Sequence, residues 1–123
     1  RMRVQSWIDE YTREAKPCVD VKEFISTNGV TQNIWVDNIP IGIFVYTFCI
    51  DTISNHIMWI KPKYRHKFRQ AAKYIAEWSI EEGYREVELI VDTRACAIVE
   101  RYLKLKPVQK IYLSKLDRIL EVL

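Results

Sequence analysis

Six basic side chains lie within a stretch of 13 residues that holds a histidine and no acidic residue. They are Lys61, Lys63, Arg65, Lys67, Arg69 and Lys73, with His66 among them. Pro62 is typical of the first turn of a helix, so this segment is expected to open one. Basic residues at a helix N-terminus oppose the helix dipole, which favours acidic side chains there. The cluster therefore indicates either an anionic ligand, such as a small polyanion or a nucleic-acid phosphate, or a solvated helix face.

Three other side chains could accept a proton in a reaction: Asp51, His56 and Glu88. An imidazole titrates near neutral pH, which suits a general base. His56 is preferred because it stands just before the basic segment, at the expected start of a strand. No spacing fixes a partner for any of the three residues. The alternative interpretation is an exposed or hydrogen-bonded histidine with no catalytic role.

Composition favours a globular protein without unusual charge. Of 123 residues, 49% are hydrophobic and 28% are charged, and the net charge is +3. This charge does not by itself call for nucleic acid or an anionic membrane. The longest strongly apolar run covers residues 39–50, which is shorter than the roughly 20 residues that a helical membrane span needs. With no basic-then-apolar leader visible, a cytoplasmic protein is expected.

The three cysteines, Cys18, Cys49 and Cys96, are widely spaced and odd in number. They fit no zinc pattern and no disulfide framework, so no metal site is expected. They are interpreted as buried free thiols.

Hydrophobic periodicity predicts two helices at the start of the chain. An apolar stripe at helical spacing predicts a first helix that ends before Pro17. The stripe consists of Val4, Trp7, Ile8, Tyr11 and Ala15. Asp20 as N-cap, with Glu23 three residues later, predicts a short second helix. Gly29 follows at a position typical of a turn or a C-cap.

The period then changes to that of strands. Residues Thr31–Val36 and Ile41–Ile50 are predicted strands joined by a turn at Asp37 and Asn38. The second is apolar on both faces, which is typical of a strand buried between two layers. Residues Asp51–Asn55 are expected to turn the chain into a third strand, His56–Ile60. Short connections make these three strands antiparallel neighbours.

The second half alternates between helices and strands. A long helix is predicted over Tyr64–Glu82, ending at Gly83. Its inward face is expected to hold Phe68, Ala71, Ala72, Ile75 and Ser79. The elements expected after it are a strand over 86–91, a helix over 94–104, a strand over 109–114, and a tail over 117–123 that is either helix or strand.

The element order ααβββαβαβ predicts a single α+β domain over residues 1–123, with a mixed, mostly antiparallel sheet and helices on both faces. The strand–helix–strand unit from His56 to Val91 should have parallel strands. Five aromatic residues on the strands are expected in the core, with a stacking surface for nucleic-acid bases as the alternative. They are Trp35, Phe44, Tyr46, Phe48 and Trp59.

Two segments resemble the GNAT family of acetyl-CoA-dependent N-acetyltransferases. Ile60–Ala71, with the sequence IKPKYRHKFRQA, resembles the segment in which a strand ends and a glycine-rich loop opens a helix. Val99–Pro107 resembles the late helix with its tyrosine. The resemblance covers roughly residues 19–114, and its divergence from the family pattern is similar to that of GNAT-like proteins encoded by bacteriophages. The small residues of the family pattern are replaced, by Phe68 and Gln70 in the loop and by Lys106 and Pro107 after the late helix.

The resemblance implies that acetyl-CoA donates an acetyl group to an amine of a small molecule or a protein. Trp59 and Ile60 would contact the cofactor, which would lie along the strand that contains them. The backbone at the start of the next helix would hold the cofactor diphosphate, over Arg65, His66, Lys67, Phe68, Arg69 and Gln70. Tyr102 stands at the position of the late-helix tyrosine, which in the family protonates the departing thiolate. The alternative is that Tyr102 is an aromatic residue that packs between helix and sheet. His56 would be the base.

Two other functions remain open from the sequence. The element order lacks a clear counterpart of the first strand of the family. This missing strand and the missing glycines favour a non-catalytic GNAT-like module that binds a protein or forms a homo-oligomer through an open sheet edge. The basic segment 61–73 favours a nucleic-acid binder, although the low net charge places this function third. No membrane partner is expected.

Overall fold

The computed structural model describes residues 2–17, 20–27, 29–90, 97, 100–101, 104 and 116–122. The chain divides into two compact units, residues 1–91 and 92–123, and each is described by itself. The predicted strand over 109–114 and most of the predicted helix over 94–104 lie outside the described residues. The single domain of the sequence analysis stays a prediction.

The first unit is built on one four-stranded sheet in the order β1-β2-β3-β4. Its strands are β1 (Val30–Val36), β2 (Ile39–Cys49), β3 (Thr52–Ile60) and β4 (Glu86–Leu89). As predicted, β1, β2 and β3 are antiparallel neighbours and β3 and β4 are parallel. Asp37 and Asn38 form the first turn with φ angles of 52° and 64°. Asp and Asn tolerate this left-handed geometry better than other residues, which explains their place there.

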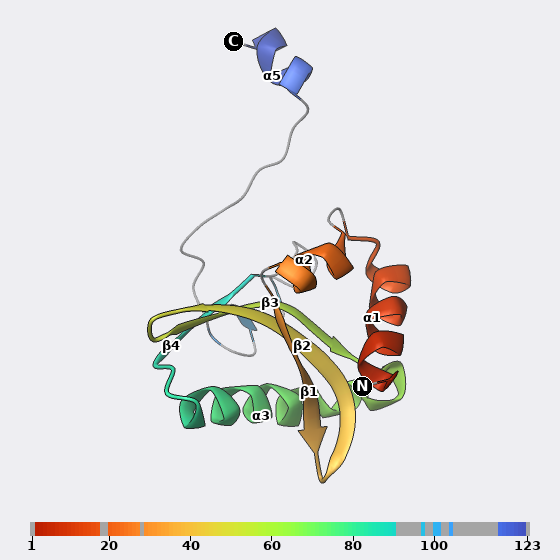
Figure 1. Cartoon of the computed structure of the whole chain (residues 1–123), viewed down its shortest axis with the longest axis vertical. Coiled ribbons are helices and arrows are strands. Elements are labelled where there is room, and N and C mark those ends of the chain that lie inside the picture. The colour runs from red at the N-terminus through yellow and green to blue at the C-terminus, as the bar shows by residue number, and fades with distance from the viewer. Residues whose placement is uncertain are drawn as a thin grey trace. The chain divides into compact units, whose positions relative to one another are not determined.

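Helices cover both faces of the sheet, as Figure 1 shows. On one face lie α1 (Met2–Ala15) and α2 (Val21–Thr27), and on the other lies α3 (Phe68–Glu81), which follows the 3₁₀ helix η1 (Pro62–Lys67). In the second unit, α5 (Leu116–Val122) confirms the helical alternative for the tail. None of the helices in the described residues is long and apolar enough to span a membrane.

Strand β2 is the shared wall of two hydrophobic cores. Its residues from Ile41 to Tyr46 are all buried. Phe44 and Tyr46 belong to the core under α3, together with Ala71 and Ile75 of that helix. The opposite core, under α1 and α2, is formed by Trp7, Ile8, Val21, Ile43, Val45, Ile57 and Trp59. The prediction of a strand apolar on both faces is therefore confirmed.

The predicted turn over Asp51–Asn55 is wrong. The turn consists of Ile50 and Asp51 alone, and β3 begins at Thr52. Residues 52–55 pair with β2 on one side and with β4 on the other. Their polar side chains are typical of a turn, but two neighbouring strands override that preference. His56 therefore lies in the middle of a strand and not at its start.

The predicted helix over Tyr64–Glu82 begins differently from the expectation. Pro62 starts it, yet residues 62–67 form a 3₁₀ helix and the α-helix starts at Phe68. Neither Lys61 nor Lys67 caps a helix with its side chain, and the first turn carries no acidic residue. A poorly capped start is consistent with the tighter 3₁₀ form. The end is as predicted: Gly83 has a φ of 96°.

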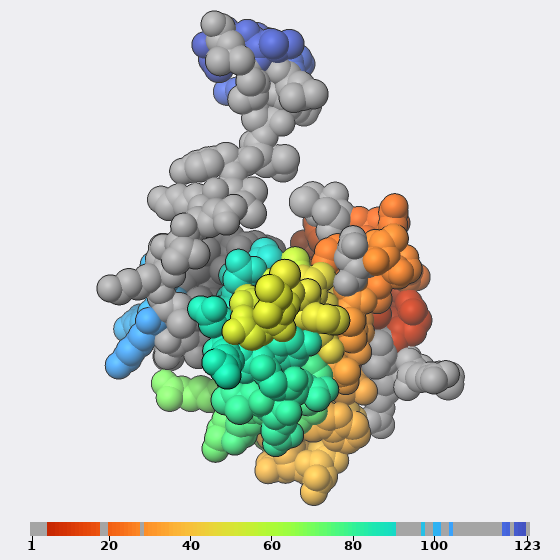
Figure 2. All heavy atoms as spheres, turned by 60° about the vertical axis from the view of Figure 1, so that its left-hand side comes forward, coloured from red at the N-terminus to blue at the C-terminus, as the bar shows by residue number. Residues whose placement is uncertain are grey.

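Two expectations about burial are wrong, one for a cysteine and one for two aromatic residues. Cys49 is a free, exposed cysteine, and neither Cys18 nor Cys96 is among the described residues. Phe48 is 58% exposed and Trp35 is 43% exposed, whereas Phe44, Tyr46 and Trp59 are buried as predicted. Phe48 and Cys49 lie at the end of β2, beside the β2–β3 turn, which Figure 2 shows in yellow on the surface. Trp35 lies on β1, an edge strand of the described sheet.

The N-cap of α2 gives a first test of the fold. The Glu23 N–H donates to Asp20 Oδ1 at 3.1 Å, as the predicted capping arrangement requires. We expect Asp20→Ala to lower the free energy of unfolding in urea by about 1 kcal/mol. Asp20→Asn keeps the acceptor oxygen and should stay close to the parent protein. Equal losses in both variants would contradict the cap.

Candidate functional site

One extra residue in β3 changes which side chains share a face of the sheet. Asn55 lies opposite Tyr46 and Ile57 lies opposite Val45, so His56 has no partner on β2. Such a β-bulge bends the strand and disrupts its pairing locally. Ile53 and Ile57 are four residues apart, and a regular strand would place both on one face. Instead, Ile53 packs under α3 and Ile57 under α1 and α2.

Strands β3 and β4 pair only up to this bulge. Their register runs from Thr52 to Asn55, and the Ile90 N–H donates to the Asn55 carbonyl at 3.0 Å. In the part of the chain that the structure describes, no strand pairs with β3 beyond the bulge on that side. The Lys61 N–H donates to Ile41 of β2, so the backbone groups of Ile60 and Met58 point away from β2.

His56 projects into a small polar cluster on the α2 side of the sheet. Its Nε2 shares a 2.8 Å hydrogen bond with Thr47 Oγ1 of β2. The ring of Phe24, from α2, lies 4.9 Å away with the two planes tilted by 58°. On the other side, Ser54 Oγ donates to Glu88 Oε1 of β4 at 2.6 Å. Thr47 of β2 and Phe24 of α2 therefore contact the imidazole, and β4 brings the charge of Glu88 near it.

The environment of His56 favours its neutral form. Burial lowers the pKa of the imidazole from its ordinary value of 6.5, and the negative charge of Glu88 opposes part of that shift. A neutral imidazole at physiological pH has a lone pair available to accept a proton. Asp51, the third possible base, lies in the β2–β3 turn, where its carbonyl accepts the N–H groups of Arg85 and Glu86.

The basic segment has acidic partners that the sequence did not place near it. Lys61 pairs with Glu10 of α1 at 3.4 Å, and Arg65 pairs with Glu14 of the same helix. Lys67 lies 3.7 Å from Asp37 in the β1–β2 turn. These contacts account for part of the cluster as internal ion pairs.

The other basic side chains of the segment are on the surface of the protein. Lys63 lies over the ring of Tyr64, 5.0 Å from its centroid, and His66, Arg69 and Lys73 are exposed.

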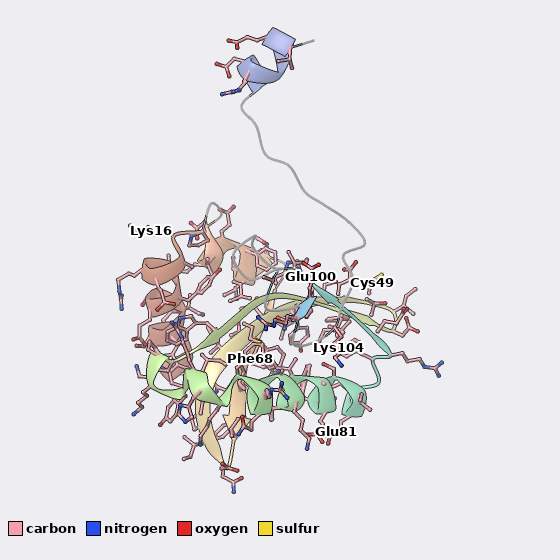
Figure 3. All side chains as sticks on the ribbon, turned by 180° about the vertical axis from the view of Figure 1, so that it is seen from behind. Lys16, Cys49, Phe68, Glu81, Glu100 and Lys104 are labelled. Atoms are coloured by element: carbon pink, nitrogen blue, oxygen red, sulfur yellow. The ribbon has the colours of Figure 1, made fainter. Side chains whose placement is uncertain are left out.

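The predicted diphosphate cradle is the end of η1 and the first turn of α3. Phe68 is half-buried and packs against the core under α3, on the side of the helix that faces the sheet (Figure 3). Gln70 is exposed. The Phe68 N–H donates to the Arg65 carbonyl, which uses one of the donors of this turn. The bulky ring is thus accommodated in the core.

Arg65 links the free edge of β3 to α1. Its Nε donates to the Ile60 carbonyl at 2.9 Å, while its Nη2 donates to Glu14. Trp59 is 4% exposed, and its ring centroid lies 6.1 Å from that of Trp7. Its Nε1 has no hydrogen-bond partner among the described residues. Two of the predicted cofactor contacts, Ile60 and Arg65, are therefore in contact with each other. The side chain of a third, Trp59, lies in the core.

Tyr102 lies outside the described residues, so its predicted role stays a prediction. The sequence analysis missed Thr47 and Ser54, which complete the surroundings of His56. Their signal was a hydroxyl residue in the otherwise apolar run of β2 and a second one two residues before His56. With the two-residue turn in place, Thr47 pairs directly with Ser54.

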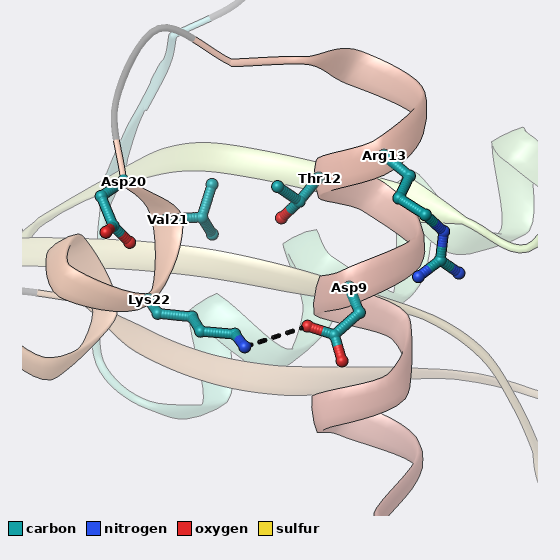
Figure 4. A pocket seen from close by; sticks show the side chains of 6 residues that line it. All are labelled: Asp9, Thr12, Arg13, Asp20, Val21 and Lys22. Atoms are coloured by element: carbon teal, nitrogen blue, oxygen red, sulfur yellow. Dashed lines mark ion pairs between the residues drawn. The ribbon is translucent and has the colours of Figure 1, made fainter.

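A shallow pocket of about 410 Å³ lies between α1 and α2 (Figure 4). It is lined by Asp9, Thr12, Arg13, Asp20, Val21 and Lys22. Lys22 and Asp9 form an ion pair across it at 3.3 Å. Asp20 is occupied as the N-cap of α2 and Thr12 Oγ1 donates to the Ile8 carbonyl, so four of the polar groups of this pocket already have internal roles.

No family profile matches the sequence, and no curated protein matches it. Solved structures do match. The aminoglycoside N-acetyltransferase AAC(6')-Iy, in complex with the bisubstrate analogue CoA-S-monomethyl-acetylneamine, has a TM-score of 0.59 and 11% identity, covering 94% of this chain and 92% of that one. A ribosomal-protein-alanine N-acetyltransferase from Brucella melitensis biovar Abortus 2308 has a TM-score of 0.63 and 10% identity, covering 89% and 87%.

An integron cassette protein from the mobile metagenome of Cole Harbour Salt Marsh is similar too, with a TM-score of 0.60 and 14% identity over 93% of this chain and 82% of that one. These likenesses show the fold. The chain has the GNAT fold in a divergent form, as the sequence predicted, and it shares this fold with acetyl-CoA-dependent N-acetyltransferases. The comparison with bacteriophage proteins stays a prediction.

Proposed function

We propose that this GNAT-fold chain transfers an acetyl group from acetyl-CoA to an amine of a small molecule or a protein. The bulge at His56 is the observation that carries the proposal. Beyond it, β3 leaves β4 and turns the backbone of Met58 and Ile60 toward a side without a described strand. Support comes from the fold, which AAC(6')-Iy, solved with CoA, shares.

The residues present fit this cofactor. The Met58 backbone offers a donor and an acceptor that amide groups of an extended ligand arm could pair with, as a strand would. Lys63, His66 and Arg69, exposed at the start of the following helices, suit a diphosphate. Phe68 packs into the core and Gln70 is exposed, so both are compatible with a ligand in front of this turn. When bound, acetyl-CoA would supply an activated thioester.

In this proposal His56 is the general base. An ammonium cannot attack a thioester, so the acceptor must lose a proton before it reacts. The neutral imidazole accepts that proton, and Glu88 stabilises the resulting imidazolium. Tyr102 would donate a proton to the departing thiolate.

A thermal-shift titration with acetyl-CoA tests the proposal. A ligand that binds the native state raises its stability, by about 2.7 kcal/mol at one hundred times Kd. We expect Tm to rise with acetyl-CoA and CoA but not with pantetheine, which carries no phosphate group, at the same concentration. Release of free thiol in the presence of an amine panel then measures transfer. The absence of any shift at millimolar acetyl-CoA would end the proposal.

Glu14→Gln sharpens the same experiment. Glu14 pairs with Arg65, so its carboxylate competes with any anion that needs this guanidinium. Removing that charge should lower the Kd for CoA a few-fold, and more at low salt than at high salt. Glu77→Gln, on the exposed part of α3, is the charge-matched control and should leave Kd unchanged. An equal effect in both variants would show only a change in net charge.

A second candidate function is a non-catalytic module that binds a protein or another copy of itself. The ion pairs of Lys61, Arg65 and Lys67 favour it, because they occupy side chains that would otherwise meet a ligand. Within the described part of the sheet, β1 has β2 as its one neighbour, which leaves an edge for a partner strand. A concentration-dependent mass in light scattering, without any response to acetyl-CoA, would favour this function.

A further inference from the structure

The polar side chains around His56 form an ordered row across three strands. Thr47 of β2 is the register partner of Ser54 of β3, and Ser54 is the register partner of Glu88 of β4. His56 stands two residues after Ser54 on β3. The bulge lets His56 point to the same face as Ile57, with the ring of Phe24 against it.

From this arrangement we propose that Thr47 is a positioning residue, which accepts a hydrogen bond from the Nε2–H of His56 and thereby leaves Nδ1 as the basic nitrogen. The inference rests on the proposed function and concerns the same site. The hydrogen bond between Thr47 and Nε2 is 2.8 Å long. Within the described part of the chain, no group bonds to Nδ1 of this ring. A neutral imidazole has one proton, so fixing it on Nε2 leaves the lone pair on Nδ1.

The proton balance of the step follows from this assignment. An acceptor ammonium gives one proton to Nδ1, and the lone pair of the resulting free amine forms the new C–N bond while the C–S bond of the thioester breaks. The nitrogen loses a second proton as the amide forms, which balances the proton that the departing sulfur takes up. The imidazolium then holds protons on both nitrogens, Nε2–H still donating to Thr47 Oγ1. Glu88 is the charged group whose field reaches His56, and Ser54 holds it in place at 2.6 Å. The proton returns to solvent from Nδ1.

The alternative tautomer gives Thr47 the opposite role. If the Thr47 hydroxyl donates to Nε2, the proton of the neutral ring is on Nδ1 and no basic nitrogen remains free. The two tautomers differ in the ¹⁵N shifts of the imidazole, so NMR distinguishes them without cofactor or substrate. The chain has two histidines, and exposed His66 is the internal reference.

The experiment records the imidazole ¹⁵N spectrum of the full chain at a pH above 7, for the parent protein and three variants. We expect the parent His56 to be predominantly the Nε2–H tautomer. Thr47→Val should abolish that preference, Thr47→Ser should keep it, and Thr52→Val, the same change two residues before Ser54, should leave it intact. A parent protein in the Nδ1–H form, or a tautomer ratio unchanged in Thr47→Val, would overturn the inference.

A pH titration in the same spectra adds a second readout. A donor hydrogen bond is stronger from an imidazolium than from a neutral ring, so Thr47 as acceptor raises the proton affinity of His56. Thr47→Val should therefore move its titration to lower pH, and a move to higher pH would contradict the assignment. In catalysis, the variant should lower kcat more than it raises KM. If transfer is absent while the tautomer result holds, the proposed function fails and the positioning of His56 stands.

Discussion

Replacing His56 with glutamine is expected to lower kcat for acetyl transfer by about 10²- to 10⁴-fold, the usual contribution of a general base. Glutamine keeps a polar group that reaches Thr47, but it cannot accept a proton near neutral pH. KM for acetyl-CoA should change little, because the proposed cofactor contacts lie at Met58 and along the basic segment. Steady-state kinetics with thiol detection measures both constants.

His66→Gln is the matched control, since it removes the other histidine of the chain from an exposed position on η1. It should retain kcat, while KM for acetyl-CoA should rise because His66 is one of the exposed residues proposed to face the diphosphate. Equal activity in His56→Gln and the parent protein would remove His56 from the mechanism and leave a water-mediated route.

The pH dependence of the same site has a defined sign. Because burial lowers the pKa of His56, its charged form is disfavoured in the folded protein. The folded state then binds fewer protons than the unfolded state below pH 6.5, so stability falls as the pH drops from there through the folded pKa. The rate should fall over the same interval, since a protonated base cannot accept. The stability change should be smaller in His56→Gln.

Gly42→Ala is expected to cause the largest loss of stability among single methyl additions to this chain. A Cβ at this position would lie 2.1 Å from the Trp59 carbonyl oxygen and 2.9 Å from the Ile60 Cα. Both atoms are backbone of the neighbouring strand, so relief requires β2 and β3 to separate. We expect a loss of about 3 kcal/mol or more in urea unfolding, in the range of severe core substitutions.

Gly83→Ala provides the comparison. Its φ of 96° disfavours any side chain, yet nothing lies within 4 Å of the added Cβ. Its cost should be limited to the conformational term of about 1–2 kcal/mol. A Gly42→Ala protein as stable as Gly83→Ala would contradict the close approach of β2 and β3. The fraction of Gly42→Ala protein that still folds should also bind acetyl-CoA more weakly, because the separation of β2 and β3 displaces Ile60.

Much of the fold follows from local patterns in the sequence. The apolar stripe of α1, the Asp20 cap of α2 and the two-sided apolar run of β2 each identify their element without tertiary information. Errors arise where tertiary contacts decide. Thr52–Asn55 have the composition of a turn, and only pairing with both β2 and β4 makes them a strand.

The site was less predictable than the fold for a related reason. A bulge is a relation between two strands, so the sequence of β3 alone does not reveal that His56 lies outside the ladder. The acidic partners of the basic segment are Glu10, Glu14 and Asp37, which lie 51, 51 and 30 residues before the basic residues they pair with. The place of His56 just before the basic segment supplied its choice and the family resemblance supplied the cradle, while the neighbours Thr47 and Ser54 required the register.

The outer edge of β1 has a practical consequence for handling the protein. Its seven residues, VTQNIWV, contain neither a charge nor a proline, the two devices that commonly keep an edge strand from self-association. Trp35, nearly half exposed, adds an apolar side chain at that rim. Since β1 is an edge of the described sheet, we expect concentrated preparations to self-associate by strand pairing at this edge, and Trp35→Lys should reduce that association.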